Sequence, residues 1–220
     1  SSLKGKDNQA DYIVITHASL SKGLEPLVDF RRSQGLTVKV VDVQDIYDEF
    51  DYGIFSPEAI RDFLKYAYEN WRKPRPTFAL LAGDGTFDYQ DYWQTGRENL
   101  VPVYLVYSPN FGETVSDNWF VDFNDDRMPE MFIGRFPVRT GAQLGSVINK
   151  ILAYENTSPN AEWTKKLLFV ADGEKAFEEV SDSLIGLVPS GYTVNKLYLS
   201  SSTPQDTRQG IIDNLDQGAL

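Results

Sequence analysis

The sequence predicts an α/β fold in which helices pack on both faces of a mostly parallel sheet. Three short apolar runs, at 12–15, 37–43 and 78–82, have the length and composition of buried strands. Two stretches with apolar residues at helical spacing separate them, so the order is β-α-β-α-β. Because parallel strands need long right-handed crossovers, this order predicts a parallel sheet. Polar residues after the strands are then expected at one edge of the sheet, where such folds bind ligands.

Capping signals define the two helices between these strands. Apolar residues at helical spacing begin at Leu24, and Gly35 is placed to end that helix, because glycine tolerates the left-handed conformation of a C-terminal cap. Ser56 followed by Pro57 is a typical helix start, with a capping side chain and then a residue that needs no amide partner. An apolar stripe continues to Trp71, and the prolines that follow end the second helix.

The stretch from residue 85 to residue 128 is rich in Asp, Asn, Gly, Tyr and Trp and has weak periodicity. Within it we expect short strands at 101–106 and 118–121. A loop-rich stretch of this length is usually functional. Regular structure is predicted to resume with a strand at 131–137, a helix capped by Thr140, a strand at 167–171, a helix at 177–187, a strand at 192–199 and a helix that begins after Thr203.

Composition excludes several classes of function. The net charge of −11 argues against nucleic-acid binding, because phosphates must be neutralised by Lys and Arg. Cysteine is absent, which excludes disulfides, Cys-based zinc sites and a Cys nucleophile within this stretch. No apolar run is long enough to span a membrane. Residues 1–10 are polar and are interpreted as an interdomain linker or an appended start, without a signal peptide.

Three segments together resemble the gingipain-type cysteine peptidases. They are residues 12–17 with 30–38, residues 80–84 (Leu-Leu-Ala-Gly-Asp), and residues 116–120 with 129–137 (Pro-Glu-Met-Phe-Ile-Gly-Arg-Phe-Pro). Each segment alone is weak, but their order and spacing extend over nearly the whole chain. The resemblance implies a caspase-like α/β/α sandwich with two subdomains. It places an N-terminal α/β subdomain at 11–128 and the first part of a catalytic subdomain at 129–220, with the boundary near Met128.

The resemblance also implies an activity. Gingipain-like enzymes are secreted or surface endopeptidases of bacteria that hydrolyse protein and peptide substrates through a Cys-His pair. In the family this pair follows two consecutive strands of the second subdomain, which places it beyond residue 220, so this stretch alone is predicted to be inactive. A family glutamate that is associated with the histidine matches Glu130. Only that supporting role is assigned to Glu130, and its alternative is an exposed residue at the start of a strand.

Single residues allow competing interpretations. His17, the only histidine, closes the first strand and is interpreted as a polar residue that bonds a neighbouring carbonyl, not as a catalytic base. Asp84, Asp88 and Asp117 belong to a cluster of loop aspartates without EF-hand spacing. Gingipain-like proteins bind calcium, so these three are candidate calcium ligands, and the alternative is solvated turn residues. The Gly-Asp-Gly turn at 83–85 lacks the spacing of a nucleotide-binding loop, so no organic cofactor is expected.

Two functions therefore remain open. The first is a peptidase fragment. The second is a non-catalytic binding or scaffold domain of the same fold, which would use its acidic and aromatic loops to hold a ligand. Trp93 and Trp119 belong to those loops, although aromatic residues in such a stretch more often form its small core.

Overall fold

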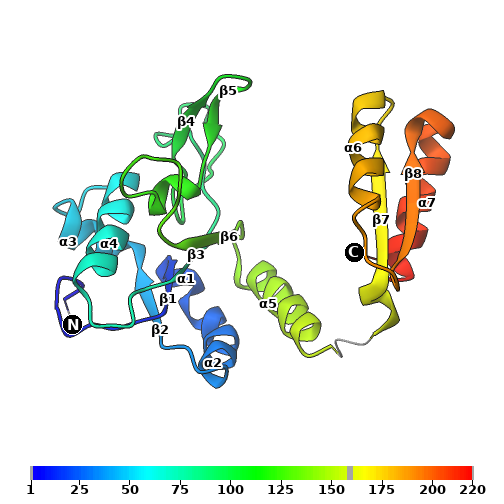
Figure 1. Ribbon diagram of the computed structural model, residues 1–220. Helices are drawn as coiled ribbons and strands as arrows, with labels where there is room; N and C mark the ends of the chain where they lie inside the picture. The colour runs from blue at the N-terminus through cyan, green and yellow to red at the C-terminus, as the bar shows by residue number, and fades with distance from the viewer. Residues whose placement is uncertain (1, 158–160, 220) are drawn as a thin grey trace. The chain divides into compact units, whose positions relative to one another are not determined.

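The computed structural model describes residues 2–157 and 161–219, so Ser1 of the predicted linker lies outside the described residues (Figure 1). The chain divides into two compact units, Ser1–Tyr154 (unit 1) and Glu155–Leu220 (unit 2). Both units combine helices with parallel strands, which confirms the predicted α/β class. Among the described residues, no helix is both long and apolar enough to span a membrane.

Unit 1 is built on a four-stranded parallel sheet with the order β2-β1-β3-β6. Strand β1 is central, and its residues pair with β2 on one side and β3 on the other, both in parallel. This arrangement confirms the parallel pairing that the β-α-β-α-β order predicts. The strands of this sheet are β1 (Tyr12–Thr16), β2 (Val38–Asp42), β3 (Phe78–Ala82) and β6 (Phe132–Phe136).

Helices cover both faces of this sheet and create two hydrophobic cores. Strand β1 alternates between them: Ile13 and Ile15 belong to one core, and Val14 belongs to the other. Fully buried Phe63 anchors the first core, and Leu144 anchors the second. The helices of unit 1 are α1 (Ala18–Ser21), η1 (Lys22–Leu24), α2 (Glu25–Ser33), α3 (Val43–Phe50), α4 (Pro57–Asn70) and α5 (Gly141–Glu155), of which α5 runs to the unit boundary.

The predicted caps are present. The Ser56 hydroxyl accepts a hydrogen bond from the Ala59 amide at 3.2 Å and begins α4. Gly35 follows α2 with φ of +89°, a conformation that disfavours residues with a Cβ. The Thr140 hydroxyl accepts from the Gln143 amide at 3.2 Å at the start of α5.

Three local predictions are wrong. The second strand ends at Asp42, whose side chain accepts from the Gln44 amide and caps the unpredicted helix α3. The 118–121 segment is a 3-10 helix, η2 (Asn118–Val121), because its apolar side chains turn into the core instead of alternating along a strand. Of the predicted strand at 101–106, only the last two residues lie in a strand. They begin β4 (Leu105–Ser108), which forms a hairpin with antiparallel β5 (Gly112–Val115).

The subdomain bounds at 11–128 and 129–220 stay a prediction from the sequence. In the structure, strand β6 follows Met128 and pairs with β3, and the first compact unit ends at Tyr154. The predicted linker is packed as well: Leu3 and Ala10 are buried in the first core. The Trp71 indole donates to the Leu3 carbonyl at 2.9 Å, which ties residues 1–10 to the end of α4.

Unit 2 is small and carries little core of its own. Its two strands pair in parallel, and Ala171 and Thr207 are its only buried side chains among the described residues. Thr203 caps the last helix as predicted, accepting from the Asp206 amide at 3.1 Å. The elements are η3 (Glu162–Lys165), β7 (Lys166–Ala171), α6 (Lys175–Ile185), β8 (Thr193–Tyr198), η4 (Leu199–Ser201) and α7 (Pro204–Asp216).

Candidate functional site

An arginine at the carboxyl end of the unit 1 sheet organises the loops above it. The Arg135 side chain is 10% exposed and pairs with both carboxylate oxygens of Asp117, at 2.8 to 3.1 Å. The same guanidinium donates to the carbonyls of Gly83, Val101 and Pro102 at 2.7 to 2.9 Å. Arg135 therefore connects β6 to the turn after β3 and to the loop-rich stretch at 84–130, called here the loop lobe.

A second arginine holds the start of the loop lobe. The Arg139 guanidinium donates to Asp84 Oδ2 at 2.7 Å, and both side chains are 29% exposed. The Asp84 backbone is equally engaged, since its amide donates to the Val138 carbonyl and its carbonyl accepts from the Leu100 amide. Asp84 therefore lies at the carboxyl edge of the sheet, where the sequence predicts it. Its carboxylate faces the Arg139 guanidinium.

Gly85 lies where the loop lobe folds back on itself. A Cβ at this position would approach the Val101 carbonyl oxygen to 2.6 Å and the Val103 amide nitrogen to 3.1 Å. We expect Gly85→Ala to destabilise unit 1 by about 1–3 kcal/mol, because backbone atoms must move to admit the methyl group. Urea denaturation followed by circular dichroism measures this loss.

A matched control is Gly145→Ala, because Gly145 is in helix α5 and a Cβ there meets no atom within 4 Å. That substitution should stabilise the chain by roughly 0.5–1 kcal/mol, since alanine loses less backbone entropy in a helix. Equal effects of the two substitutions on the free energy of unfolding would show that the backbone around Gly85 moves to admit the methyl group without a loss of stability.

Two further aspartates of the loop lobe accept hydrogen bonds from nearby backbone amides. Asp88 accepts from the amides of Tyr92 and Trp93, both at 2.9 Å. Asp91 accepts from the Gly96 amide at 3.0 Å, and this bond is the main cause that lowers the pKa of its carboxyl group. These carboxylates fix turns of the loop.

The described residues contain no group of three acidic or histidine side chains placed to hold a metal ion. Calcium takes six to eight oxygen ligands, whereas the oxygens of Asp84 and Asp117 face arginines and those of Asp88 face amides. As placed, these three predicted ligands do not fit one calcium ion. Calcium binding stays a prediction from the sequence.

Thermal unfolding in millimolar calcium and then in chelator tests that prediction. An ion that binds only the folded chain raises the free energy of unfolding by about 2.7 kcal/mol at a hundredfold excess over its dissociation constant. If the chain binds calcium, the midpoint of unfolding should therefore be higher in calcium than in chelator. Since Asp84 and Asp117 are paired with Arg139 and Arg135, ligation by them would require both ion pairs to open. The same midpoint in calcium and in chelator would assign these carboxylates to the contacts seen here.

Glu130 closes the loop that leads into β6. Its carboxylate accepts from the Phe123 amide at 2.7 Å and from the Asn124 side-chain amide at 2.8 Å. Its own amide donates to the Val121 carbonyl at 2.9 Å. The side chain that the family resemblance associates with a catalytic histidine is thus oriented by two hydrogen bonds, which leave lone pairs on both carboxylate oxygens.

A pocket of about 420 Å³ adjoins this loop, and an arginine that the sequence did not single out lies beside one of its aromatic lining residues. Trp119 lines it, stacked on Tyr104 with ring centroids 3.4 Å apart, and the Arg61 guanidinium lies 4.8 Å from the Trp119 ring. Arg61 also donates to the Asp122 carbonyl and to the Asp125 carboxylate. The helical spacing of α4 marks Arg61 only as a partly exposed charge, so no signal in the sequence identifies these partners.

His17 is a helix cap. Its Nδ1 accepts from the Ser19 amide at 3.2 Å and lies 2.8 Å from the Ser19 hydroxyl, at the start of α1. The predicted partner was a neighbouring carbonyl, and the observed partners are an amide and a hydroxyl. The cap explains why a polar residue ends β1.

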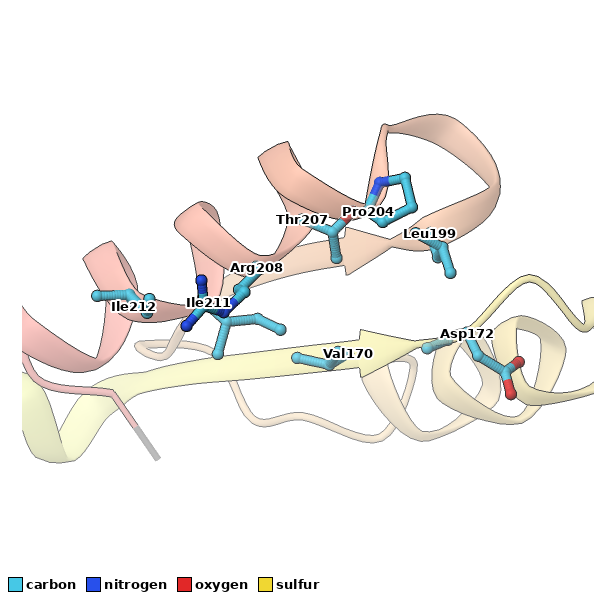
Figure 2. A pocket seen from close by; sticks show the side chains of 9 residues that line it. Val170, Asp172, Leu199, Pro204, Thr207, Arg208, Ile211 and Ile212 are labelled. Carbon is cyan, nitrogen blue, oxygen red and sulfur yellow. The ribbon is translucent and has the colours of Figure 1, made fainter.

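Unit 2 carries a pocket of about 470 Å³ at the carboxyl end of β7 (Figure 2). It is bounded by Val170 of β7, by Asp172 just after that strand, and by Thr207 and Ile211 of helix α7. Asp172 accepts from the Glu174 amide at 2.8 Å, and the hydroxyl oxygen of Thr207 is buried without a partner among the described residues. The lining is mainly apolar and offers no thiol or imidazole. This pocket is suited to apolar side chains.

Comparison with known proteins decides the family. The model of peptidase family C25 matches residues 5–220, which is nearly the entire chain. The chain belongs to peptidase family C25. This family is that of the gingipains, so the resemblance stated from the three sequence segments is confirmed.

Solved structures similar to this C25 chain show the same fold. Dimeric latent PorU from Porphyromonas gingivalis is 23% identical with a TM-score of 0.57, over 81% of this chain and 20% of that chain. A structure of a protease is 21% identical with a TM-score of 0.65, over 94% of this chain and 43% of that chain. The C25 chain thus spans less than half of either structure. No curated protein sequence matches it.

Membership of C25 gives the arrangement of Glu130 a context. The Pro-Glu-Met-Phe-Ile-Gly-Arg-Phe-Pro segment that carried the resemblance places Glu130 in the closed loop and Arg135 in β6. The supporting role of Glu130 stays a prediction, and sequence reasoning did not single out Arg135, which makes more hydrogen bonds. The only available signal for Arg135 was a charged residue within an otherwise apolar strand.

Proposed function

We propose that this C25 chain is part of a secreted or cell-surface bacterial cysteine endopeptidase of gingipain type, which cleaves peptide bonds in protein substrates. The family match over residues 5–220 is the observation that carries the proposal. The chain contains no cysteine, and its only histidine caps a helix. The proposal therefore places the Cys-His pair beyond residue 220 and makes this stretch inactive by itself.

The chemistry required of the full-length enzyme is that of a thiol peptidase. A thiolate attacks the scissile carbonyl carbon and forms a tetrahedral intermediate, while a nearby imidazolium keeps the sulfur deprotonated. The imidazolium then gives its proton to the leaving amine, and water releases the acyl group. Within this stretch, Glu130 is proposed as a positioning residue that orients the imidazole through its carboxylate, which the contacts to Phe123 and Asn124 hold in place.

Full-length protein and a panel of fluorogenic peptides test the activity. We expect hydrolysis that a thiol reagent abolishes and a chelator of transition metals leaves unchanged. The 220-residue stretch serves as the control. It should not hydrolyse any peptide, because it has no cysteine thiol to act as the nucleophile. Hydrolysis that survives the thiol reagent, or depends on a metal, would overturn the proposal.

Glu130→Gln in the full-length enzyme tests the supporting role. Glutamine keeps the acceptor for the Phe123 amide but removes the charge, and we expect kcat/KM to fall about tenfold, which is about 1.4 kcal/mol. A neighbouring carboxylate stabilises the charged imidazolium and raises its pKa. Removal of the charge lowers that pKa, so the alkaline limb of the pH profile should move to lower pH.

The control for this variant is Glu113→Gln on strand β5, which removes the same charge from an exposed side chain of the loop lobe. It should leave both kcat/KM and the pH profile unchanged. If Glu130→Gln lowers only the midpoint of thermal unfolding and leaves the pH profile in place, Glu130 merely closes its loop.

A binding or scaffold domain is the second candidate function. The observation in its favour is a set of exposed aromatic side chains in the loop lobe: Tyr92 is 82% exposed, Trp93 68% and Phe111 82%. Exposed aromatic rings that gather in one surface patch mark binding sites. A full-length protein that binds a protein ligand through these residues without cleaving any peptide would establish this function in place of the first.

A further inference from the structure

Two loops of unit 1 meet through a pair of aromatic rings that line a groove. Phe55, in the loop before α4, and Tyr89, in the loop lobe, lie edge to face with ring centroids 5.3 Å apart. Both rings are partly exposed, at 38% and 39%. They border a groove of about 340 Å³, which is at the lower end of the range for small-ligand sites. The two loops therefore form one surface on which an apolar face of a ligand can pack.

Contacts with the rest of unit 1 hold both rings in place. The Phe55 ring packs on that of Tyr47, with centroids 5.6 Å apart, and Tyr47 is buried in helix α3. The Tyr89 hydroxyl donates to the Val103 carbonyl, so this polar group is already satisfied within the protein. Rings that are fixed before a ligand arrives lose little entropy when it binds, so the pair is preorganised for binding.

A second pair of exposed rings lies on the same loop. Phe87 and Trp93 are edge to face, with centroids 5.2 Å apart. Asp88 fixes the turn between them, because its carboxylate accepts hydrogen bonds from the amides of Tyr92 and Trp93, both at 2.9 Å. Several large rings that are exposed on one ordered loop mark a binding surface. The second pair extends this surface beyond the groove, so a ligand longer than one ring can use both pairs.

The rest of the groove offers hydrogen-bonding groups of both kinds. Arg97 and the amide groups of Gln90 and Asn99 supply donors, and the Glu98 carboxylate supplies acceptors. Among the described residues, the exposed side chains of Gln90, Arg97 and Glu98 have no hydrogen-bond or ion-pair partner. Because a free guanidinium and a free carboxylate line the same groove, a ligand of either net charge meets a group of its own sign. The lining therefore favours a neutral ligand that both donates and accepts.

A neutral sugar matches both parts of this lining. A sugar ring has a face of C–H groups, which packs on an aromatic ring, and an edge of hydroxyls, which donate and accept hydrogen bonds. We propose that this groove binds a neutral oligosaccharide. One sugar ring packs on Phe55 and Tyr89 with its hydroxyls toward Arg97 and Glu98, and a further sugar unit reaches Trp93. The inference rests on neither function proposed above, because binding at the groove requires no hydrolysis and no protein partner.

Isothermal titration calorimetry of the full-length protein with neutral hexasaccharides tests this site. The probes are the hexamers of glucose, galactose, mannose and N-acetylglucosamine. We expect at least one to bind with the same Kd in low and high salt, because an uncharged ligand gains nothing from the charge of the protein. The disaccharide of that sugar should bind more weakly, since it is too short to contact both ring pairs. Failure of all four hexamers to bind, or a Kd that rises steeply with salt, would overturn the proposal.

Substitutions of Tyr89 separate the contribution of its ring from that of its hydroxyl. Tyr89→Ala should raise the Kd about tenfold, because it removes the packing surface at the centre of the groove. Tyr89→Phe should leave the Kd nearly unchanged, since the hydroxyl already bonds to Val103. Trp93→Ala, at a more exposed ring, should remove the difference in Kd between hexasaccharide and disaccharide. The control is Tyr107→Ala, which truncates an exposed ring on β4 outside the groove and should change nothing.

Arg97→Gln and Glu98→Gln distinguish a neutral ligand from a charged one. Both variants should weaken binding of the sugar, because each replaces a charged hydrogen-bonding group by a neutral one. With a basic ligand such as oligolysine, Arg97→Gln would instead strengthen binding and Glu98→Gln would weaken it, and an acidic ligand would reverse these signs. Effects of opposite sign on the sugar, or tighter binding of oligolysine or oligoglutamate than of any hexasaccharide, would overturn the proposal. Peptide hydrolysis is not a readout here, so a failed activity assay leaves the result of this test intact.

Discussion

Replacing Arg135 with methionine is expected to destabilise unit 1 by about 3 kcal/mol, the lower end of the cost of removing one partner of a buried ion pair, because this pair is only partly buried. Methionine fills much of the arginine volume but donates no hydrogen bond. The Asp117 carboxylate, 26% exposed, then loses its cation, and the carbonyls of Gly83, Val101 and Pro102 lose their donor. Urea denaturation followed by circular dichroism measures the difference.

Two comparisons isolate the cause of that loss. Arg72→Met removes an arginine that pairs with Asp7 at the surface, where the Arg72 side chain is 64% exposed and the Asp7 side chain 88%. This substitution should change the free energy of unfolding little. Asp117→Asn combined with Arg135→Met should cost less than the sum of the single changes, since the two groups interact. Additive losses would show that Arg135 acts through its carbonyl contacts alone.

Replacing Phe63 with alanine should lower the free energy of unfolding by about 3–5 kcal/mol, because it opens a cavity in the first core. The Phe63 ring is fully buried on the inner face of α4. It makes edge contacts with Phe50 and Trp71, at centroid distances of 5.6 and 5.7 Å. Those partners belong to α3 and to the end of α4, so the cavity loosens the layer that covers this face of the sheet.

Phe111→Ala is the matched control for the cavity. Phe111 lies in the turn between β4 and β5 and is 82% exposed, so the same truncation there removes almost no buried area. Its free energy of unfolding should stay within about 0.5 kcal/mol of the parent value. A loss below about 1 kcal/mol for Phe63→Ala would mean that the surrounding rings close the cavity.

Part of the candidate site could be predicted because its signals are local. Asp84 comes just after the apolar strand β3, and Glu130 comes just before the apolar strand β6. Their places at strand ends therefore follow from the order of the chain. Arg135 could not be predicted in the same way. Its partners lie 18 to 52 residues earlier in the sequence, in a stretch without periodicity, and only the folded loop brings them to one guanidinium.

The parallel pairing of the first three sheet strands and the caps at Ser56 and Gly35 were determined by the sequence itself, because short apolar runs and capping residues act within a few residues. The tertiary structure decided where the units divide, how the loop lobe is tied to the sheet and which charges Asp84 and Asp117 meet. These features depend on contacts between distant segments. An aspartate in a loop looks the same in sequence whether it faces a calcium ion, an amide or an arginine, and only the fold places one of them within hydrogen-bonding distance.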